Sequence, residues 1–342
     1  MIVSFLLLIS MIVFPAAASV PVDFTPAWSY VGGSGPAVEP LIAGDSVIVA
    51  LHGRTVVALD ARTGQVGWSA VLPEEPADTM VAFEESLYIP GNQGTLMVHS
   101  LATGSFETAV IIGNAPLLEP LVVADALVVG DREGTVTILD QDSLEVRSTH
   151  VMQTGAVDAI SLDGFAVFAN RDGLITGLEV ATTEVQWQTV TASSPTSLTA
   201  LDGTILLGTG VGDVFMLSAD DGSIQWQNAY TASSMMDFAM AGNEVLGISR
   251  NGDLLAFDPG TGDLQWQGVL TTGGYFASNE CEPNCLVTLI DGTLTTVSSL
   301  EHEIVALGQA IQPIGIRPVS SNEIVVVITR QGDVIAWGLE PG

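Results

Sequence analysis

The sequence has 342 residues, 47% of them hydrophobic, and a mean hydropathy of +0.46, a composition that provides a large core and excludes a disordered chain. It carries 39 acidic residues against eight basic ones, all arginine, and this formal charge of −31 excludes nucleic acid as a partner, because phosphate binding depends on clustered Lys and Arg. The acidity fits an exported protein of a saline or acidic habitat, or one that attracts cationic ligands.

The chain opens with an apolar run, MIVSFLLLISMIVFPAAA, that ends in small residues. Ala16 to Ala18 fit an A-x-A cleavage site, so we predict a signal peptide over residues 1–18 and an exported mature domain over residues 19–342. No basic residue precedes the run, which leaves retention as an anchor open. After cleavage, no segment is expected to span a membrane.

A repeat of about forty residues runs through the mature chain. A glycine opens each apolar run such as GRTVVALD and GDLLAFD, and these glycines recur with the period of the repeat, at Gly53, Gly94, Gly134, Gly173, Gly212, Gly252, Gly292 and Gly332. A fixed period of this length with strand-like content is typical of a propeller. We call these residues the anchor glycines.

The first repeat, residues 38–71, predicts four antiparallel strands, named A to D: VEPLIA, SVIVAL, TVVALD and QVGWSAV. Strands B and C are apolar on both faces, so both faces must be covered by protein. Sheets stacked around an axis meet this requirement, and the eight glycines predict an all-β, eight-bladed propeller of four-stranded antiparallel blades. We expect it to be a monomer.

The N-terminal stretch FTPAWSYVG has the pattern of a D strand without A, B or C strands before it. The last repeat, in contrast, stops before a D strand of its own. We therefore predict that the N-terminal strand joins the last blade and closes the ring, which removes two open sheet edges.

Tryptophans recur at the same place in the D strands, at a nearly constant distance after their anchor glycines, at Trp68, Trp187, Trp226 and Trp266, and Trp28 fits the same place. The turns before Trp68 and Trp266 read D-x-x-T-G, in which the Asp accepts backbone N–H groups and the Gly supplies positive φ. DARTGQVGW and DPGTGDLQW resemble the repeats of the pyrroloquinoline-quinone-like propellers. The resemblance implies that each Trp docks its blade on the next. The family includes quinone-dependent dehydrogenases and non-enzymatic outer-membrane assembly factors.

The two cysteines, Cys281 and Cys285, lie on either side of the A–B turn of the seventh repeat. An even pair in an exported chain favours a disulfide. Two thiols make a poor metal site, and we predict no metal there.

Two sets of charged residues recur at fixed places in the repeat. Five arginines lie close to an anchor glycine, on B–C turns: Arg54, Arg132, Arg171, Arg250 and Arg330. Four acids lie at a nearly constant distance before their anchors, where strand A begins: Glu39, Glu119, Asp158 and Asp237. Strand A lines the axis, so the geometry predicts a ring of carboxylates at the mouth of a central channel, with arginines further out. Such charges either bind a ligand or only solubilise the rim.

The sequence contains no catalytic motif, and its four histidines fall at different strand positions. We therefore predict a non-catalytic propeller, without a cofactor, that recognises a protein or small ligand at one rim, in envelope assembly or as an extracellular sensor. The alternative is a pyrroloquinoline-quinone- and calcium-dependent oxidoreductase, in which the four acids serve as metal ligands or base and an Arg lies near the quinone. A purely structural cell-surface module is a third reading.

Overall fold

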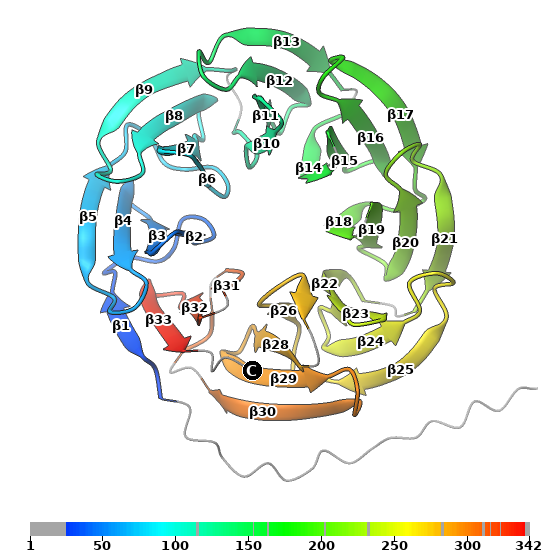
Figure 1. Ribbon diagram of the computed structural model, residues 1–342. Helices are drawn as coiled ribbons and strands as arrows, with labels where there is room; N and C mark the ends of the chain where they lie inside the picture. Colours follow the sequence, from blue (N-terminus) through cyan, green and yellow to red (C-terminus); the bar gives the residue numbers. More distant parts are fainter. Residues whose placement is uncertain are drawn as a thin grey trace, which may run out of the picture.

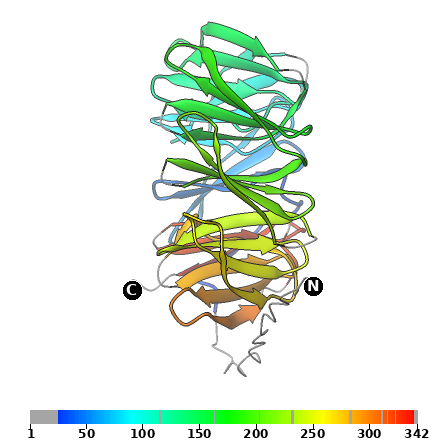
Figure 2. The same ribbon diagram turned by 90° about the vertical axis from the view of Figure 1, so that its right-hand side faces the viewer.

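The computed structural model describes residues 25–338, except for 114–115, 153, 163, 202, 231–232, 282–283, 310–311, 315 and 322. The predicted signal peptide lies outside the described residues. The described residues form 33 strands in eight sheets, which are arranged as a ring in Figure 1. Seen edge-on in Figure 2, the ring is a disc. The prediction of an eight-bladed all-β propeller is confirmed.

Blades are numbered by the order of their anchor glycines. The first four blades contain β2 (Leu41–Ala43), β3 (Ser46–Leu51), β4 (Thr55–Asp60) and β5 (Val66–Val71); β6 (Val81–Phe83), β7 (Ser86–Pro90), β8 (Thr95–Ser100) and β9 (Phe106–Ile111); β10 (Leu121–Val123), β11 (Ala126–Gly130), β12 (Thr135–Asp140) and β13 (Val146–Val151); and β14 (Ala156–Leu162), β15 (Phe165–Asn170), β16 (Leu174–Glu179) and β17 (Glu184–Val190).

The other four blades contain β18 (Pro195–Leu201), β19 (Thr204–Thr209), β20 (Asp213–Ser218) and β21 (Ile224–Ala229); β22 (Met235–Ala241), β23 (Glu244–Ser249), β24 (Asp253–Phe257), β25 (Leu264–Val269) and a fifth strand, β27 (Glu280–Cys281); β26 (Gly274–Phe276), β28 (Asn284–Leu289), β29 (Thr293–Ser298) and β30 (Glu303–Gln309); and β31 (Val319–Ser320), β32 (Ile324–Ile328), β33 (Asp333–Gly338) and β1 (Trp28–Val31).

The ring closes through β1. This strand pairs antiparallel with β33, in the register Trp28 to Ala336 and Val31 to Asp333, and is the fourth strand of blade 8. The predicted closure by the N-terminal strand is therefore confirmed. Closure matters for the axis, because it fixes the first strands of all eight blades around a common centre (Figure 1).

The core lies between blades. Alternate residues of one strand pack on opposite neighbours: Ile48 of β3 clusters with Ile89 of blade 2, whereas Val49 clusters with Val326 of blade 8. Both faces of β3 are consequently buried, and the residues from Val47 to Leu51 are at most 1% exposed. This is why the second and third strands are apolar on both faces instead of alternating.

Four of the tryptophans contact a glycine in the C–D turn of the next blade. The indole N–H of Trp28, for example, donates to the carbonyl of Ala61 at 2.8 Å, and that of Trp226 donates to the carbonyl of Pro259 at 2.7 Å. A Cβ atom on Gly262 would lie 2.6 Å from the ring of Trp226. The four glycines also have positive φ, which favours glycine, and the indole leaves no room for a side chain: Gly64, Gly104, Gly222 and Gly262.

The C–D turns of blades 3, 4 and 7 carry side chains at the same positive-φ position. Leu144 and Thr183 occupy it with φ of 58° and 57°. His302 occupies it in blade 7, and there Trp266 stacks on the imidazole at 4.9 Å and donates its N–H to Glu244 instead of to a backbone carbonyl. The glycine is therefore linked to the packing of the tryptophan, and not to the turn alone.

We expect Gly262→Ala to destabilise the fold more than Gly44→Ala, by about 1–3 kcal/mol, because only the first places a Cβ against an indole. Gly44 is the matched control, since its φ of +56° is also positive and nothing lies within 4 Å of a Cβ there. Urea unfolding of the two variants measures the difference. Equal losses of stability would show that the turn conformation alone selects the glycine.

Candidate functional site

The two faces of the ring carry different turns. The B–C turns and the D–A links lie on one face, which we call the B–C face; there, the hydroxyl of Ser34 donates to the carbonyl of His52 at 2.9 Å. The A–B and C–D turns lie on the other, the C–D face, where the N–H of Ala61 donates to the carbonyl of Asp45 at 2.8 Å. The chain alternates between the faces because consecutive strands are antiparallel.

Charged residues gather around the axis near the B–C face. They come from the starts of the first strands of six blades and include the four acids predicted from the repeat. We call this set the axial cluster: Glu39, Asp78, Glu119, Asp158, Asp237 and Arg317.

Local sequence explains how these side chains reach the axis. In blades 1, 3 and 8, the charged residue directly precedes a proline, which lacks an N–H donor and shortens the first strand; β2 begins only after Pro40. The first strand is accordingly shorter than the predicted VEPLIA. In blades 4 and 6 the strand is longer, and a register shift immediately precedes Asp158 and Asp237. Such a bulge redirects a side chain.

Arg317 is the cation of this cluster and lies two repeats after Asp237. Its Nη2 atom donates to Oδ1 of Asp237 at 2.9 Å and to Oδ1 of Asn279 at 2.8 Å. The backbone N–H of Phe276 donates to the other carboxylate oxygen of Asp237 at 2.8 Å. Blade 8 is thus tied to blade 6 across blade 7, and Asp237, at 2% exposure, is a buried charge with partners.

Asp78, like Arg317, is a member of the axial cluster that the sequence prediction did not include. It pairs with Arg132 of the B–C turn of blade 3 at 3.0 Å. Asp78 lies one position further from its anchor glycine than Glu119 does, whereas Arg317 precedes Gly332 by the same distance as Glu119 precedes its own anchor. Both residues therefore lie at or next to the position that carries an acid in other repeats, but Asp78 is one residue out of phase and Arg317 has the opposite charge.

The remaining arginines stay on the exposed B–C turns. Arg54 donates to the carbonyl of Pro73 at 2.9 Å, and Arg330 donates to that of Ile314 at 3.3 Å. Among the described residues, the side chain of Arg171 makes no hydrogen bond or ion pair, and Arg250 is exposed near Tyr275. The structure thus brings one of the five predicted arginines, Arg132, to a carboxylate of the axial cluster.

The environment of the cluster raises the pKa of its carboxyl groups. Burial is the main cause, and the neighbouring acids add to it; together they raise the pKa of Glu119 to about 8 and that of Asp158 to about 7. Burial also raises the pKa of Asp237 to about 6, although Arg317 acts in the opposite direction. The pKa values of Glu39 and Asp78 are raised for the same reason. The cluster therefore holds protons to a higher pH than exposed carboxyl groups do.

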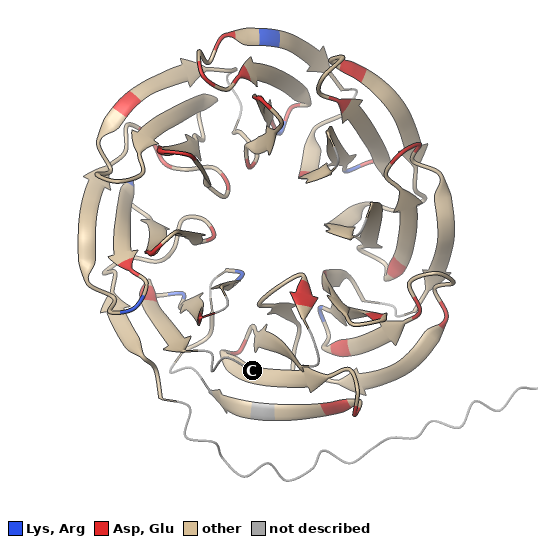
Figure 3. Ribbon diagram, viewed as in Figure 1, with Lys and Arg blue, Asp and Glu red and all other residues tan. Residues whose placement is uncertain are grey.

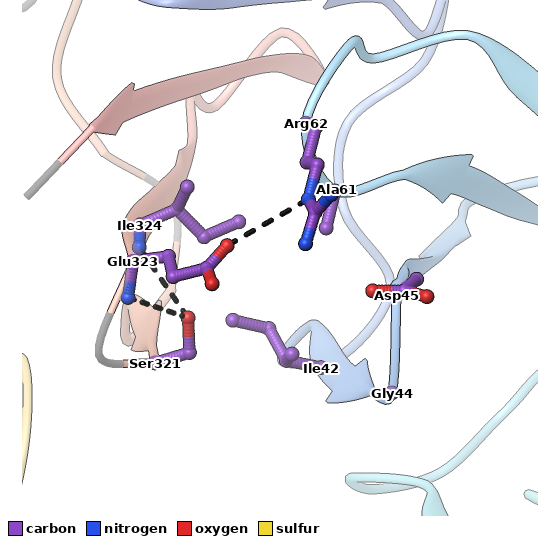
Figure 4. Close-up of a pocket in the computed structure, with 8 residues that line it drawn as sticks. All are labelled: Ile42, Gly44, Asp45, Ala61, Arg62, Ser321, Glu323 and Ile324. Carbon is purple, nitrogen blue, oxygen red and sulfur yellow. Dashed lines mark hydrogen bonds and ion pairs between the residues drawn. The ribbon is translucent and has the colours of Figure 1, made fainter.

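On the C–D face, charged side chains form ion pairs at the surface and do not gather around the axis. Its two arginines are both in ion pairs: Arg147 with Asp125 and Asp140, and Arg62 with Glu323 at 3.8 Å. Arg62 and Glu323 line a pocket between blades 1 and 8, and Figure 4 shows them pointing toward each other. Figure 3 shows acidic positions in every sector of the ring and few basic ones. This pocket is on the face opposite the axial cluster.

Cys281 and Cys285 form a disulfide bond beside blade 6. Cys281 belongs to β27, which leaves blade 7 and pairs in parallel with β22. The bond therefore lies where two blades meet. The sequence located the pair on the A–B turn of the seventh repeat, but it gave no sign of the extra strand.

Within the described residues, the axial carboxylates are not grouped as the ligands of a metal ion. Calcium takes six to eight oxygen ligands at about 2.3–2.6 Å. Within the described part of the chain, no group of three or more His, Cys, Asp or Glu side chains is arranged to hold a metal ion. The carboxylates come from separate blades and act on each other through charge.

Short turns, stacked four-stranded blades and tryptophans that reach the next blade define a propeller of the pyrroloquinoline-quinone-like repeat type. The sequence matches the family described as outer membrane protein assembly factor BamB over residues 22–149 and 171–283. The match covers more than half of the chain, and the chain belongs to this family.

Solved structures share the fold at low sequence identity. The computationally designed Ika8 protein has a TM-score of 0.80 and 16% identity, covering 90% of this chain and 97% of that chain. BamB from Moraxella catarrhalis has a TM-score of 0.76 and 17% identity, covering 93% of this chain and 98% of that chain. Sqt1 from Saccharomyces cerevisiae has a TM-score of 0.77 and 9% identity, covering 91% of this chain and 98% of that chain. At these identities the similarity shows the fold alone.

The comparison with curated proteins found no match. Within the described residues, no helix has the length and apolar character needed to cross a membrane.

The raised pKa values predict that stability falls as pH rises. Below the ordinary Glu pKa of 4.5 the group is protonated in both states, whereas up to about pH 8 only the folded state holds the proton of Glu119. We expect Glu119→Gln to leave the free energy of unfolding nearly unchanged at pH 4.5 and to raise it by about 1–4 kcal/mol at pH 9.

Urea unfolding at both pH values measures this effect. Glu107→Gln is the control for the loss of one carboxylate, because Glu107 is exposed on the outer strand β9 and lies outside the axial cluster. Parallel pH profiles for Glu119→Gln and wild type would contradict the assignment of a buried, proton-holding Glu119.

Proposed function

We propose that this chain is an exported, non-catalytic binding propeller that acts as a monomer and recognises a protein partner in envelope assembly through its B–C face. Membership of the BamB-like family supports the general reading, because that family is described as an assembly factor. The axial cluster supports the choice of face. It is the place where several blades together present groups that a single blade cannot.

The observation that carries the proposal is the convergence of five carboxylates and one arginine near the axis. Such a site suits a cationic side chain, Lys or Arg, of a partner segment that approaches the B–C face. Arg317 shows how a guanidinium is held there, with one nitrogen shared between Asp237 and Asn279. A charge-assisted hydrogen bond of this kind is stronger than a neutral one.

The outer arginines supply a second kind of contact. Arg171 is exposed on its turn and, among the described residues, has no partner for its guanidinium. It is placed to bind a carboxylate or a backbone carbonyl of the same partner. Arginines on the turns around an acidic centre would fix the orientation of the partner, because either charge alone would accept many segments.

Photo-crosslinking in the native envelope tests the choice of face. A photoreactive residue in place of Arg171 should trap one recurrent protein, whereas the same residue in place of Thr103, exposed on the C–D face, should not. The crosslink should weaken when Glu119→Gln and Asp158→Asn are combined in the same chain. Equal trapping from both faces, or none from position 171, would contradict the proposal.

Calorimetry tests the chemistry of the centre. Binding of a cation to carboxyl groups with pKa values of about 8 and about 7 must release protons, so the affinity for an arginine-containing tripeptide should rise at least tenfold from pH 5.5 to 8.5. The citrulline analogue is the matched control and should not bind. An affinity that does not change with pH would contradict a role of the axial carboxylates in binding.

Calorimetry also distinguishes the proposed partner-binding propeller from the alternative, a quinone-dependent oxidoreductase. Pyrroloquinoline quinone titrated with calcium should give no saturable heat. Binding at one site per chain, lost in the combined Glu119→Gln and Asp158→Asn variant, would favour that reading over a partner-binding propeller.

A further inference from the structure

One segment of blade 7 leaves its own sheet. After β26, the chain crosses to blade 6, where β27 pairs in parallel with β22 in the register Met240 to Glu280 and Ala241 to Cys281. The N–H of Met240 donates to the carbonyl of Asn279 at 2.7 Å. Blade 6 is the sheet to which the described residues add a fifth strand. Two residues of pairing are a short attachment.

The same segment positions Arg317. Nη2 of Arg317 is shared between Asn279, at the start of the crossing, and Asp237, in the strand that the crossing joins. The backbone of Asn279 is thus held by blade 6, and its side chain holds the arginine against blade 6. Displacement of this segment would remove one of the two acceptors that keep Arg317 at Asp237.

The disulfide closes the crossing at its far end. Cys285 is fully buried in the cluster that also contains Ala241, whereas Cys281 is only partly buried. The bond from Cys281 to this buried partner fixes β27 beside β22. Since Asn279 lies two residues before Cys281, the bond also restricts where the side chain of Asn279 reaches.

We propose that the Cys281–Cys285 disulfide is a redox-sensitive clamp that holds Arg317 against Asp237, so that reduction of the bond frees this arginine and changes the charge of the axial cluster.

The chemical step needs a dithiol as reductant. A thiolate of the dithiol attacks the partly buried sulfur of Cys281, the bond between the two protein sulfurs breaks, and Cys285 leaves as a thiolate that takes up a proton. The second thiol of the reductant then displaces Cys281, which is also protonated. Two electrons and two protons pass to the protein, and the dithiol leaves as its own disulfide.

The charged and titratable groups around Arg317 determine what its release does. Asp237 loses an ion pair in a buried position, and its pKa rises. Four other groups near the arginine lose a neighbouring positive charge: Glu39, Glu119, Asp158 and Tyr275. Arg250 is then the cation that remains near Tyr275. The cluster becomes more negative or takes up protons, depending on pH.

The clamp concerns the free protein and does not need a partner. The further statement that reduction changes binding at the B–C face rests on the proposed function. The two are separable, because the first is measured on the purified chain alone.

The test compares the oxidised full-length protein with the protein reduced by dithiothreitol. Hydrogen exchange of the Met240 amide should accelerate at least tenfold on reduction, and the titration midpoint of Asp237, followed by carboxyl-carbon NMR, should move to higher pH. The amide of Ile48 is the control and should keep its exchange rate, because it lies in β3 of blade 1, which adjoins neither blade 6 nor blade 7. The crosslink from position 171, measured in both redox states, then reports any change in partner binding.

Asn279→Ala distinguishes the effect of the Asn279 side chain from that of the disulfide bond. It leaves the disulfide and the backbone carbonyl in place, so the Met240 amide should keep its exchange rate while the Asp237 midpoint moves up as it does on reduction. The proposal is overturned if reduction changes neither readout, or if it accelerates Ile48 as much as Met240, which would make the disulfide a general cross-link. It is also overturned if Asn279→Ala leaves the Asp237 midpoint unchanged.

Discussion

Ring closure is the constraint on which the rest of this structure depends. Eight sheets that bury both faces against each other have no free face, and the pairing of β1 with β33 joins the two ends of the series. Once the ring is closed, the first strand of every blade must face the same axis. Residues one or two repeats apart then become neighbours, as Arg317 and Asp237 do. Local sequence decides only which side chain each blade contributes.

Closure also explains why the charges at the axis differ from those at the surface. An acid on the outer edge is solvated and needs no partner. At the axis, neighbouring blades bring in further acids and exclude water, so burial and like charge raise the pKa of Glu119 to about 8. Arg317 offsets part of this repulsion. The same ring that makes the fold stable therefore concentrates like charges at its centre.

The sequence predicted those features that follow the period. The blades, the closing strand and the axial position of the four acids follow from counting residues between glycines. What departs from the period was missed for a physical reason in each case. Asp78 is one residue out of phase, and the cation at the axis, Arg317, takes the place that carries an acid elsewhere. His302 replaces the turn glycine, so Trp266 stacks on it and turns its N–H to Glu244.

The crossing in blade 7 was not predictable from the repeat, because β27 pairs with another blade and not with its own. Such pairing depends on whether the inner edge of β22 is open, which is a property of the assembled ring. It lies beside the cysteine pair and beside the residue that holds Arg317. Three departures from the period thus occur in one place: an extra strand, a disulfide and the axial cation. These features are not repeated in the other blades, and their coincidence beside Arg317 is what links the disulfide to the axial cluster.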